Sequence, residues 1–168
     1  VRGRLPLPQD SECAAISVSC NRRGEIVLGE MNDYLNQVSA KLGKFALPKL
    51  PLDSHVQRVG TAPLYMVAAR RPGLDDEGLR GVLCATTELL DQAHQAGFHR
   101  LRVPLLAAGR GGCPPRFSLA EMLRAIATWH KSQVSPLKVS IHVVDPGVIF
   151  NVATGRVDVP EILSCADL

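Results

Sequence analysis

The sequence predicts an α/β fold, a three-layer α/β/α sandwich built around a mixed central sheet. Short apolar runs alternate with longer segments whose apolar residues recur at helical spacing, and this alternation is typical of such sandwiches. The 168 residues are enough for one domain with a substantial core. A hydrophobic content of 46% with 21% charged residues is ordinary for a globular protein. We therefore expect a single domain over residues 1–168.

The first half of the chain contributes two predicted strands and one predicted helix. Residues 13–20, CAAISVSC, form a short apolar run that predicts a buried strand. Residues 44–62 give no clear element, because prolines interrupt any helix there. A second strand is predicted over 63–69. An amphipathic helix that ends near Gly43 is predicted between the two strands by apolar residues at helical spacing, namely Met31, Tyr34, Leu35, Val38 and Leu42.

The second half alternates regularly between helix and strand. A helix over 77–96 is preceded by negative charge, which the helix dipole favours, and Gly97 marks its end. Strands at 101–106 and 138–144 flank a helix over 118–131, and a hairpin is expected around residues 154–155. The first of these helices is expected to bury Leu79, Val82, Leu83, either Leu89 or Leu90, and Ala93, with Cys84 on its apolar side.

The segment between the strand at 101–106 and the next helix carries the strongest functional signal. Gly109, Gly111 and Gly112 are three glycines within four residues, so the backbone there can approach a ligand closely. A loop between a strand and a helix can direct successive N–H groups at an anion. Ser118, with Glu121 three residues later, has the pattern of a capping box and predicts that the helix starts at Ser118.

This segment resembles the second phosphate loop of macrodomains, which are ADP-ribose-binding modules. Residues 108–114, AGRGGCP, are similar to the family pattern T-G-x-x-G-x-P, with alanine in place of threonine. The order of strands and helices resembles the family over residues 60–150. The resemblance implies a divergent macrodomain that binds ADP-ribose or a related nucleotide diphosphate. The ligand-binding residues that it implies are Asn21, Gly29, Ala108, Gly109, Arg110, Gly111, Gly112, Cys113 and Phe150.

Several of these assignments have a simpler structural alternative. Asn21 would contact the ribose, or it is a turn residue before Gly24. Phe150 would stack on the base, or it covers the edge of the core. Arg110 would contact a phosphate, or it is a surface arginine. Gly29 stands where the family usually has two or three glycines, and Glu30 would bring a carboxylate close to the diphosphate.

The departure at Gly29 and Glu30 leaves three functions open. The first is recognition of the nucleotide without turnover. The second is a degenerate macrodomain that serves as a protein-interaction or scaffolding module. The third is a hydrolase that removes ADP-ribose, for which Asn21, Glu30 and Asp33 are the catalytic candidates. We expect recognition rather than catalysis.

Composition indicates which classes of partner and which compartment to expect. The net charge of +3 is scattered along the chain and aromatic content is 4%, so nucleic-acid binding is not indicated. Five cysteines without a CxxC pair predict free thiols in an intracellular compartment, cytoplasmic or nuclear, and no metal site or cofactor is expected. No apolar run has the length of a membrane span. The chain begins with Val1, so we expect a piece excised from a longer polypeptide, which leaves neighbouring domains or a protein partner open.

Overall fold

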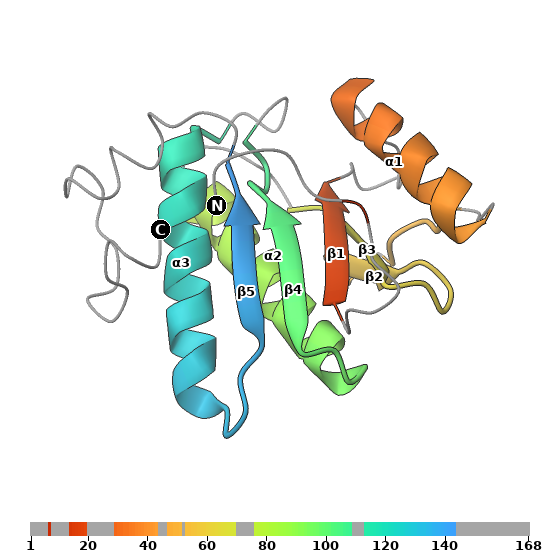
Figure 1. Cartoon of the computed structure of the whole chain (residues 1–168). Coiled ribbons are helices and arrows are strands. Elements are labelled where there is room, and N and C mark those ends of the chain that lie inside the picture. Colours follow the sequence, from red (N-terminus) through yellow and green to blue (C-terminus); the bar gives the residue numbers. More distant parts are fainter. Residues whose placement is uncertain are drawn as a thin grey trace.

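The computed structural model describes residues 7, 14–19, 29–43, 47–51, 53–69, 76–108 and 113–143. Strands and helices alternate through this part of the chain, and Figure 1 shows their arrangement. In chain order the elements are β1 (Ala14–Ser19), α1 (Gly29–Leu42), β2 (Val56–Arg58), β3 (Leu64–Val67), α2 (Asp76–Gln95), β4 (Arg100–Pro104), α3 (Pro115–Ser132) and β5 (Lys138–His142).

The sheet is mixed, as the sequence predicts. Its strand order is β2-β3-β1-β4-β5. The pairs β3–β1, β1–β4 and β4–β5 are parallel, whereas β2 pairs with β3 in the antiparallel direction. The strand β2 lies in the region where the sequence predicts no element. Three residues are too few to establish a period-two pattern, and this strand is defined by its pairing with β3 rather than by its own residues.

Two apolar clusters lie on opposite faces of the sheet and produce the three layers. On one face, α1 packs through Leu35 and Val38 against Ile16 and Val18 of β1 and Met66 of β3. On the other face, α2 and α3 cover a larger cluster that extends over β4 and β5. In Figure 1, α1 lies apart from α2 and α3, as expected for helices on opposite faces of the sheet. The α/β/α sandwich is therefore confirmed.

The helix ends agree with the sequence, but one position on α2 does not. Gly43 and Gly97, just after α1 and α2, have φ angles of 88° and 81°, which glycine tolerates best. Cys84 is exposed, so the expectation that it lies on the apolar side of α2 is wrong. It follows the buried Val82 by two residues, which is about 200° around a helix and therefore the opposite side. Leu89 and Leu90 are both buried.

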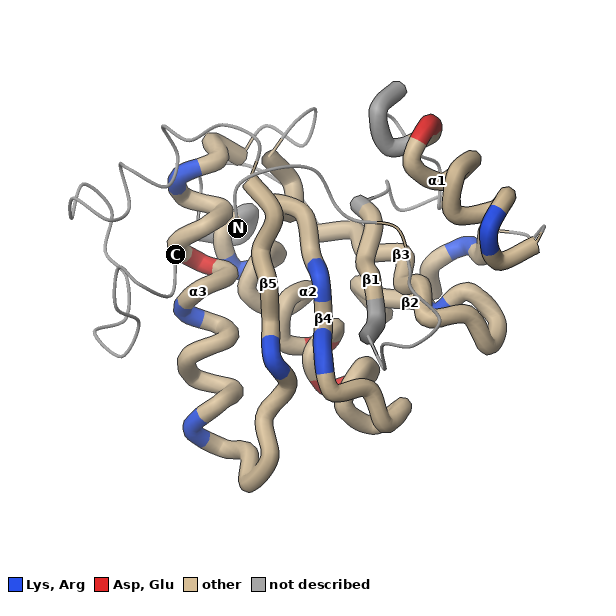
Figure 2. The backbone as a smooth tube through the Cα atoms, viewed as in Figure 1, with Lys and Arg blue, Asp and Glu red and all other residues tan. Residues whose placement is uncertain are grey.

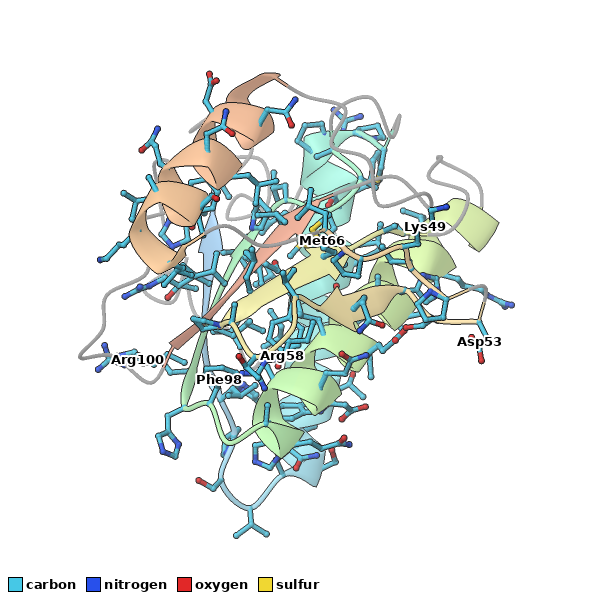
Figure 3. All side chains as sticks on the ribbon, turned by 90° about the vertical axis from the view of Figure 1, so that its right-hand side faces the viewer. Lys49, Asp53, Arg58, Met66, Phe98 and Arg100 are labelled. Atoms are coloured by element: carbon cyan, nitrogen blue, oxygen red, sulfur yellow. The ribbon has the colours of Figure 1, made fainter. Side chains whose placement is uncertain are left out.

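Side chains of α2 fasten β2 to the sandwich. The carboxylate of Glu88 accepts hydrogen bonds from the hydroxyl of Ser54 and from the backbone N–H of His55, the latter at 2.8 Å. Gln92 Nε2 donates to the carbonyl of Val56 at 3.3 Å. At the other end of β2, the guanidinium of Arg58 lies 5.1 Å from the ring centre of Phe98, and Figure 3 shows these two side chains together. Polar contacts thus hold an edge strand that buries little apolar surface.

An aromatic cluster joins the carboxyl-terminal turns of α2 and α3. Trp129 is 4% exposed, and its Nε1 donates to Asp91 Oδ1 at 2.7 Å. The His94 ring lies edge-on to the indole, with 5.4 Å between the ring centres. His130 Nε2 lies 3.0 Å from the carbonyl of Leu137, just before β5. None of the helices in the described ranges is long and apolar enough to cross a membrane.

Candidate functional site

The carboxyl ends of the parallel strands and the start of two helices share one edge of the sheet. The strands β1, β4 and β5 run in the same direction, and Figure 1 shows their arrowheads at the edge where α1 and α3 begin. In open α/β sheets, ligands bind outside this edge. The segment that the sequence singles out, between β4 and α3, lies there.

The backbone turns sharply where it leaves β4. Ala107 has a φ of 57°, and it is the one non-glycine residue with a positive φ in the described ranges. Alanine disfavours this left-handed conformation because its Cβ approaches the backbone. The N–H of Cys113 donates to the carbonyl of Ala107 at 3.2 Å. The chain therefore departs at Ala107 and is back within hydrogen-bond distance at Cys113, with the glycines between these two points.

The helix α3 begins at Pro115, three residues before the start that the capping box predicts. Pro114 is the N-cap and has no side-chain cap, while Pro115 lacks the N–H that would otherwise need a partner. The backbone N–H groups of Phe117 and Ser118 donate to the Pro114 carbonyl at 3.0 and 3.1 Å. The capping box is therefore wrong: Ser118 lies inside the helix, fully buried, and its hydroxyl donates to the Leu106 carbonyl at 2.5 Å.

The start of α3 is electrostatically suited to an anion. The first turn contains no acidic residue, and Figure 2 shows a basic segment there. The basic residue of this first turn is Arg116, whose guanidinium lies 5.0 Å from the ring centre of Phe117. The nearest acid of α3, Glu121, lies 3.7 Å from Arg124. The helix dipole and Arg116 therefore both contribute positive potential at this edge.

The turn has two stems, Ala107 where the chain enters it and Cys113 where the chain returns. The amide and the thiol of Cys113 already have partners, so few of its polar groups are available to a ligand. Its side chain is 2% exposed, and the thiol lies 3.7 Å from the Pro114 carbonyl. Burial raises the pKa of the Cys113 thiol, and the nearby Glu121 carboxylate raises it further. Its N–H is already bonded to Ala107. The expectation that Cys113 contacts a ligand stays a prediction, although its amide and thiol are both engaged within the turn.

The predicted residues at the start of α1 lie at the same edge. Gly29 is the first residue of α1, and Asp33, one turn later, is exposed to solvent. Next to it Tyr34 is half-buried; burial raises the pKa of its hydroxyl, and the positive charge of Arg102 in β4 opposes that rise. Arg102 therefore lies on the same face of the sheet as α1.

The other predicted site residues lie mostly outside what the structure describes. Ala108 is placed beside the turn and is half-buried. The side chain of Glu30 lies outside the described part, although its backbone belongs to α1. No group of three or more histidine, cysteine or acidic side chains within the described ranges could hold a metal ion. The predicted residues that lie outside the described ranges altogether are Asn21, Gly109, Arg110, Gly111, Gly112 and Phe150.

Comparison with solved structures decides which fold this is. A mutant of the Oceanobacillus iheyensis macrodomain superposes with a TM-score of 0.56 and 11% identity, over 83% of this chain and 81% of that one. The Thermus aquaticus DarG macrodomain gives a TM-score of 0.44 at 16% identity, over 86% and 97% of the two chains. Thermosipho africanus DarTG, solved with ADP-ribose, gives 0.49 at 14% identity, over 95% of this chain and 43% of that one.

The chain has a macrodomain fold. The superposition on the Oceanobacillus iheyensis protein extends over most of both chains and carries this conclusion. No protein-family model and no curated protein matches the sequence. The likeness to the Oceanobacillus iheyensis protein is therefore one of fold, at 11% sequence identity.

Sequence reasoning does not find the side chains that hold the turn of this macrodomain fold. They are Ser118 and Met122 of α3, which bond to the backbone of Leu106. The sequence pattern predicts Ser118 as a helix cap. No local pattern distinguishes these roles, because the bonds join residues 12 and 16 positions apart in the chain.

Proposed function

We propose that this macrodomain-like module binds ADP-ribose, or a related nucleotide diphosphate, at the carboxyl edge of the sheet. Backbone N–H groups of residues 109–112 would hold the diphosphate, with the start of α3 contributing its dipole. Asn21 and Phe150 would contact ribose and base, as the resemblance to macrodomains implies. The chemistry would be recognition rather than turnover.

The turn between Ala107 and Cys113 is the observation that carries this proposal. A non-glycine residue held at a φ of 57° is an energetically unfavourable conformation, and such conformations concentrate at ligand-binding sites. The Cys113 N–H is bonded to Ala107 and is not available to an anion, so the proposal assigns that role to the N–H groups of residues 109–112. Positive potential from Arg116 and the helix dipole favours a diphosphate in this position.

The proposal is tested by calorimetric titration of the protein with ADP-ribose. We expect binding in the micromolar range, which corresponds to roughly −8 kcal/mol. Gly112→Glu should abolish it, because a carboxylate would take the place intended for the diphosphate. The matched control is Thr128→Glu, which adds the same charge at an exposed position near the other end of α3 and should leave affinity unchanged. Absence of binding up to millimolar ADP-ribose would refute the proposal.

The two other functions receive less support from the described residues. A docking module needs a contiguous exposed apolar patch. The exposed large apolar side chains in the described ranges are Leu47 and Val134, which are isolated from each other in sequence and belong to separate segments. For hydrolysis, the candidate Asp33 is a solvent-exposed residue of α1. Release of ADP-ribose from a modified protein, reduced by Asn21→Ala or Glu30→Ala, would support the hydrolase instead.

A further inference from the structure

Two side chains of α3 bind both polar groups of the Leu106 backbone. The Ser118 hydroxyl donates to the Leu106 carbonyl at 2.5 Å, and the Leu106 N–H donates to Met122 Sδ at 3.5 Å. The Ser118 hydroxyl also lies 3.8 Å from the same sulfur. Both side chains are 0% exposed. Leu106 lies two residues beyond the end of β4, so α3 supplies the partners that a neighbouring strand would supply inside the sheet.

The bond to Ser118 acts directly on the strained residue. The Leu106 carbonyl belongs to the peptide plane that precedes Ala107, and rotation of this plane about the N–Cα bond of Ala107 is the φ angle of Ala107. The direction of that carbonyl, together with the Ala107 carbonyl held by Cys113, therefore restrains the φ of 57°. The next carbonyl, that of Ala107, then points at the N–H of Cys113. A buried hydroxyl in α3 thus determines how the chain enters and leaves the glycine segment.

We infer that Ser118 is a positioning residue for ligand binding: it orients the turn whose backbone N–H groups receive the diphosphate, without touching the ligand itself. This inference rests on the proposed function. Without the hydroxyl, the Leu106 carbonyl loses its partner among the described residues, and the peptide plane can rotate more easily toward a relaxed φ at Ala107. The proposed anion-binding N–H groups follow Ala107 directly in the chain, so a change of φ there would weaken ligand binding.

Ser118→Ala is the informative variant, and Thr86→Val is its matched control. Thr86 is 2% exposed, and its hydroxyl donates to the Val82 carbonyl at 2.8 Å within α2. Both substitutions therefore remove a buried hydroxyl that bonds to a backbone carbonyl. They differ in that Ser118 bonds to the entry of the turn. Ser118→Cys keeps a donor at this position, although a weaker one on a larger atom, and it replaces Ser118→Ala if that variant does not fold.

Two measurements separate positioning from general stabilisation. In the ligand-free protein, amide hydrogen exchange over residues 105–113 should accelerate in Ser118→Ala and stay as in the wild type in Thr86→Val. Calorimetry should show ADP-ribose affinity about tenfold weaker in Ser118→Ala, equivalent to about 1.4 kcal/mol, and within twofold of wild type in Thr86→Val. Ser118→Cys should fall between wild type and Ser118→Ala in both measurements.

The outcomes distinguish this inference from the proposed function. Unchanged exchange over 105–113 in Ser118→Ala, or an equal loss of affinity in Thr86→Val, would overturn the positioning role. If the wild-type protein does not bind ADP-ribose, the proposed function fails, and the exchange measurement alone then decides whether Ser118 orients the turn.

Discussion

The N–H of Cys113 and the carbonyl of Ala107 form a hydrogen bond of 3.2 Å across the mouth of the glycine segment. This bond joins the residue at which the chain enters the segment to the residue at which it returns. On the entry side, the Leu106 backbone is also bonded to Ser118 and Met122 of α3. Substitutions within the stems should consequently change stability, whereas substitutions at the glycines should change ligand affinity.

The conformation of Ala107 predicts an unusual response to substitution. Ala107→Val should lower the free energy of unfolding by about 2 kcal/mol, because a β-branched side chain is strongly disfavoured at a positive φ. Ala107→Gly should be close to neutral, since relief of strain offsets the greater entropy of the unfolded chain. Urea denaturation followed by circular dichroism measures both.

The neighbouring alanine provides the control for this prediction. Ala108 does not have a positive φ. Ala108→Gly should therefore cost about 0.5–1 kcal/mol, the usual penalty for glycine where alanine fits. Equal effects of glycine at both positions would show that Ala107 is not strained in solution.

The carboxylate of Glu88 predicts a local loss of order at the edge of the sheet. Glu88→Ala removes the acceptor for the Ser54 hydroxyl and the His55 N–H. It should lower the free energy of unfolding by about 2 kcal/mol, because hydrogen bonds to a charged group contribute more than neutral ones. Amide exchange over residues 54–58 should accelerate, since these two bonds hold the start of this segment to α2.

A second acidic residue, Glu121, provides the control for the Glu88 substitution. Glu121 lies 3.7 Å from Arg124, whose side chain is 48% exposed, so this ion pair is screened by water. Glu121→Ala should cost roughly 0.5 kcal/mol or less. If the two alanine variants were equally stable, Glu88 would not anchor β2.

The two cysteines in the described ranges should differ sharply in reactivity. Cys84 is exposed, whereas Cys113 is buried with its pKa raised above the ordinary value of 9.0. A raised thiol pKa keeps the unreactive neutral form as pH increases, so alkylation of Cys113 should stay slow up to about pH 9 in the folded protein. Mass spectrometry of iodoacetamide-treated protein should detect labelling at Cys84 first. In urea, both should react at similar rates; labelling of Cys113 as fast as Cys84 without denaturant would contradict its burial.

Periodicity predicted most of the fold because the apolar residues themselves define it. Helical spacing identified α1, α2 and α3, and short apolar runs identified β1, β3, β4 and β5. The strand β2 escaped prediction because its position depends on Glu88 and Gln92 of α2, more than 30 residues later. Cys84 was misplaced because cysteine is usually buried, although its angular position on α2 is that of a surface residue.

The sequence indicates where a candidate site would lie, which stays a prediction, but it does not indicate how the turn beside it is built. Three glycines after an apolar strand mark the edge where a ligand would lie. The pattern from Ser118 to Glu121 is local, however, and it favoured a cap at a position where tertiary packing places a buried hydroxyl under Leu106. Nor does any feature of the sequence around Ala107 indicate a left-handed alanine. Contacts between an element and the loop before it are decided by packing, which a single sequence does not display.

The cluster around Trp129 has a practical consequence for spectroscopy. Trp129 is the one tryptophan of the chain, and it lies 14 residues beyond Pro115, roughly 21 Å along α3 from the start of that helix. Its indole is enclosed by Asp91 and His94, which belong to the opposite end of the sandwich. Its intrinsic fluorescence will therefore follow cooperative unfolding faithfully and stay silent when a nucleotide occupies the distant edge.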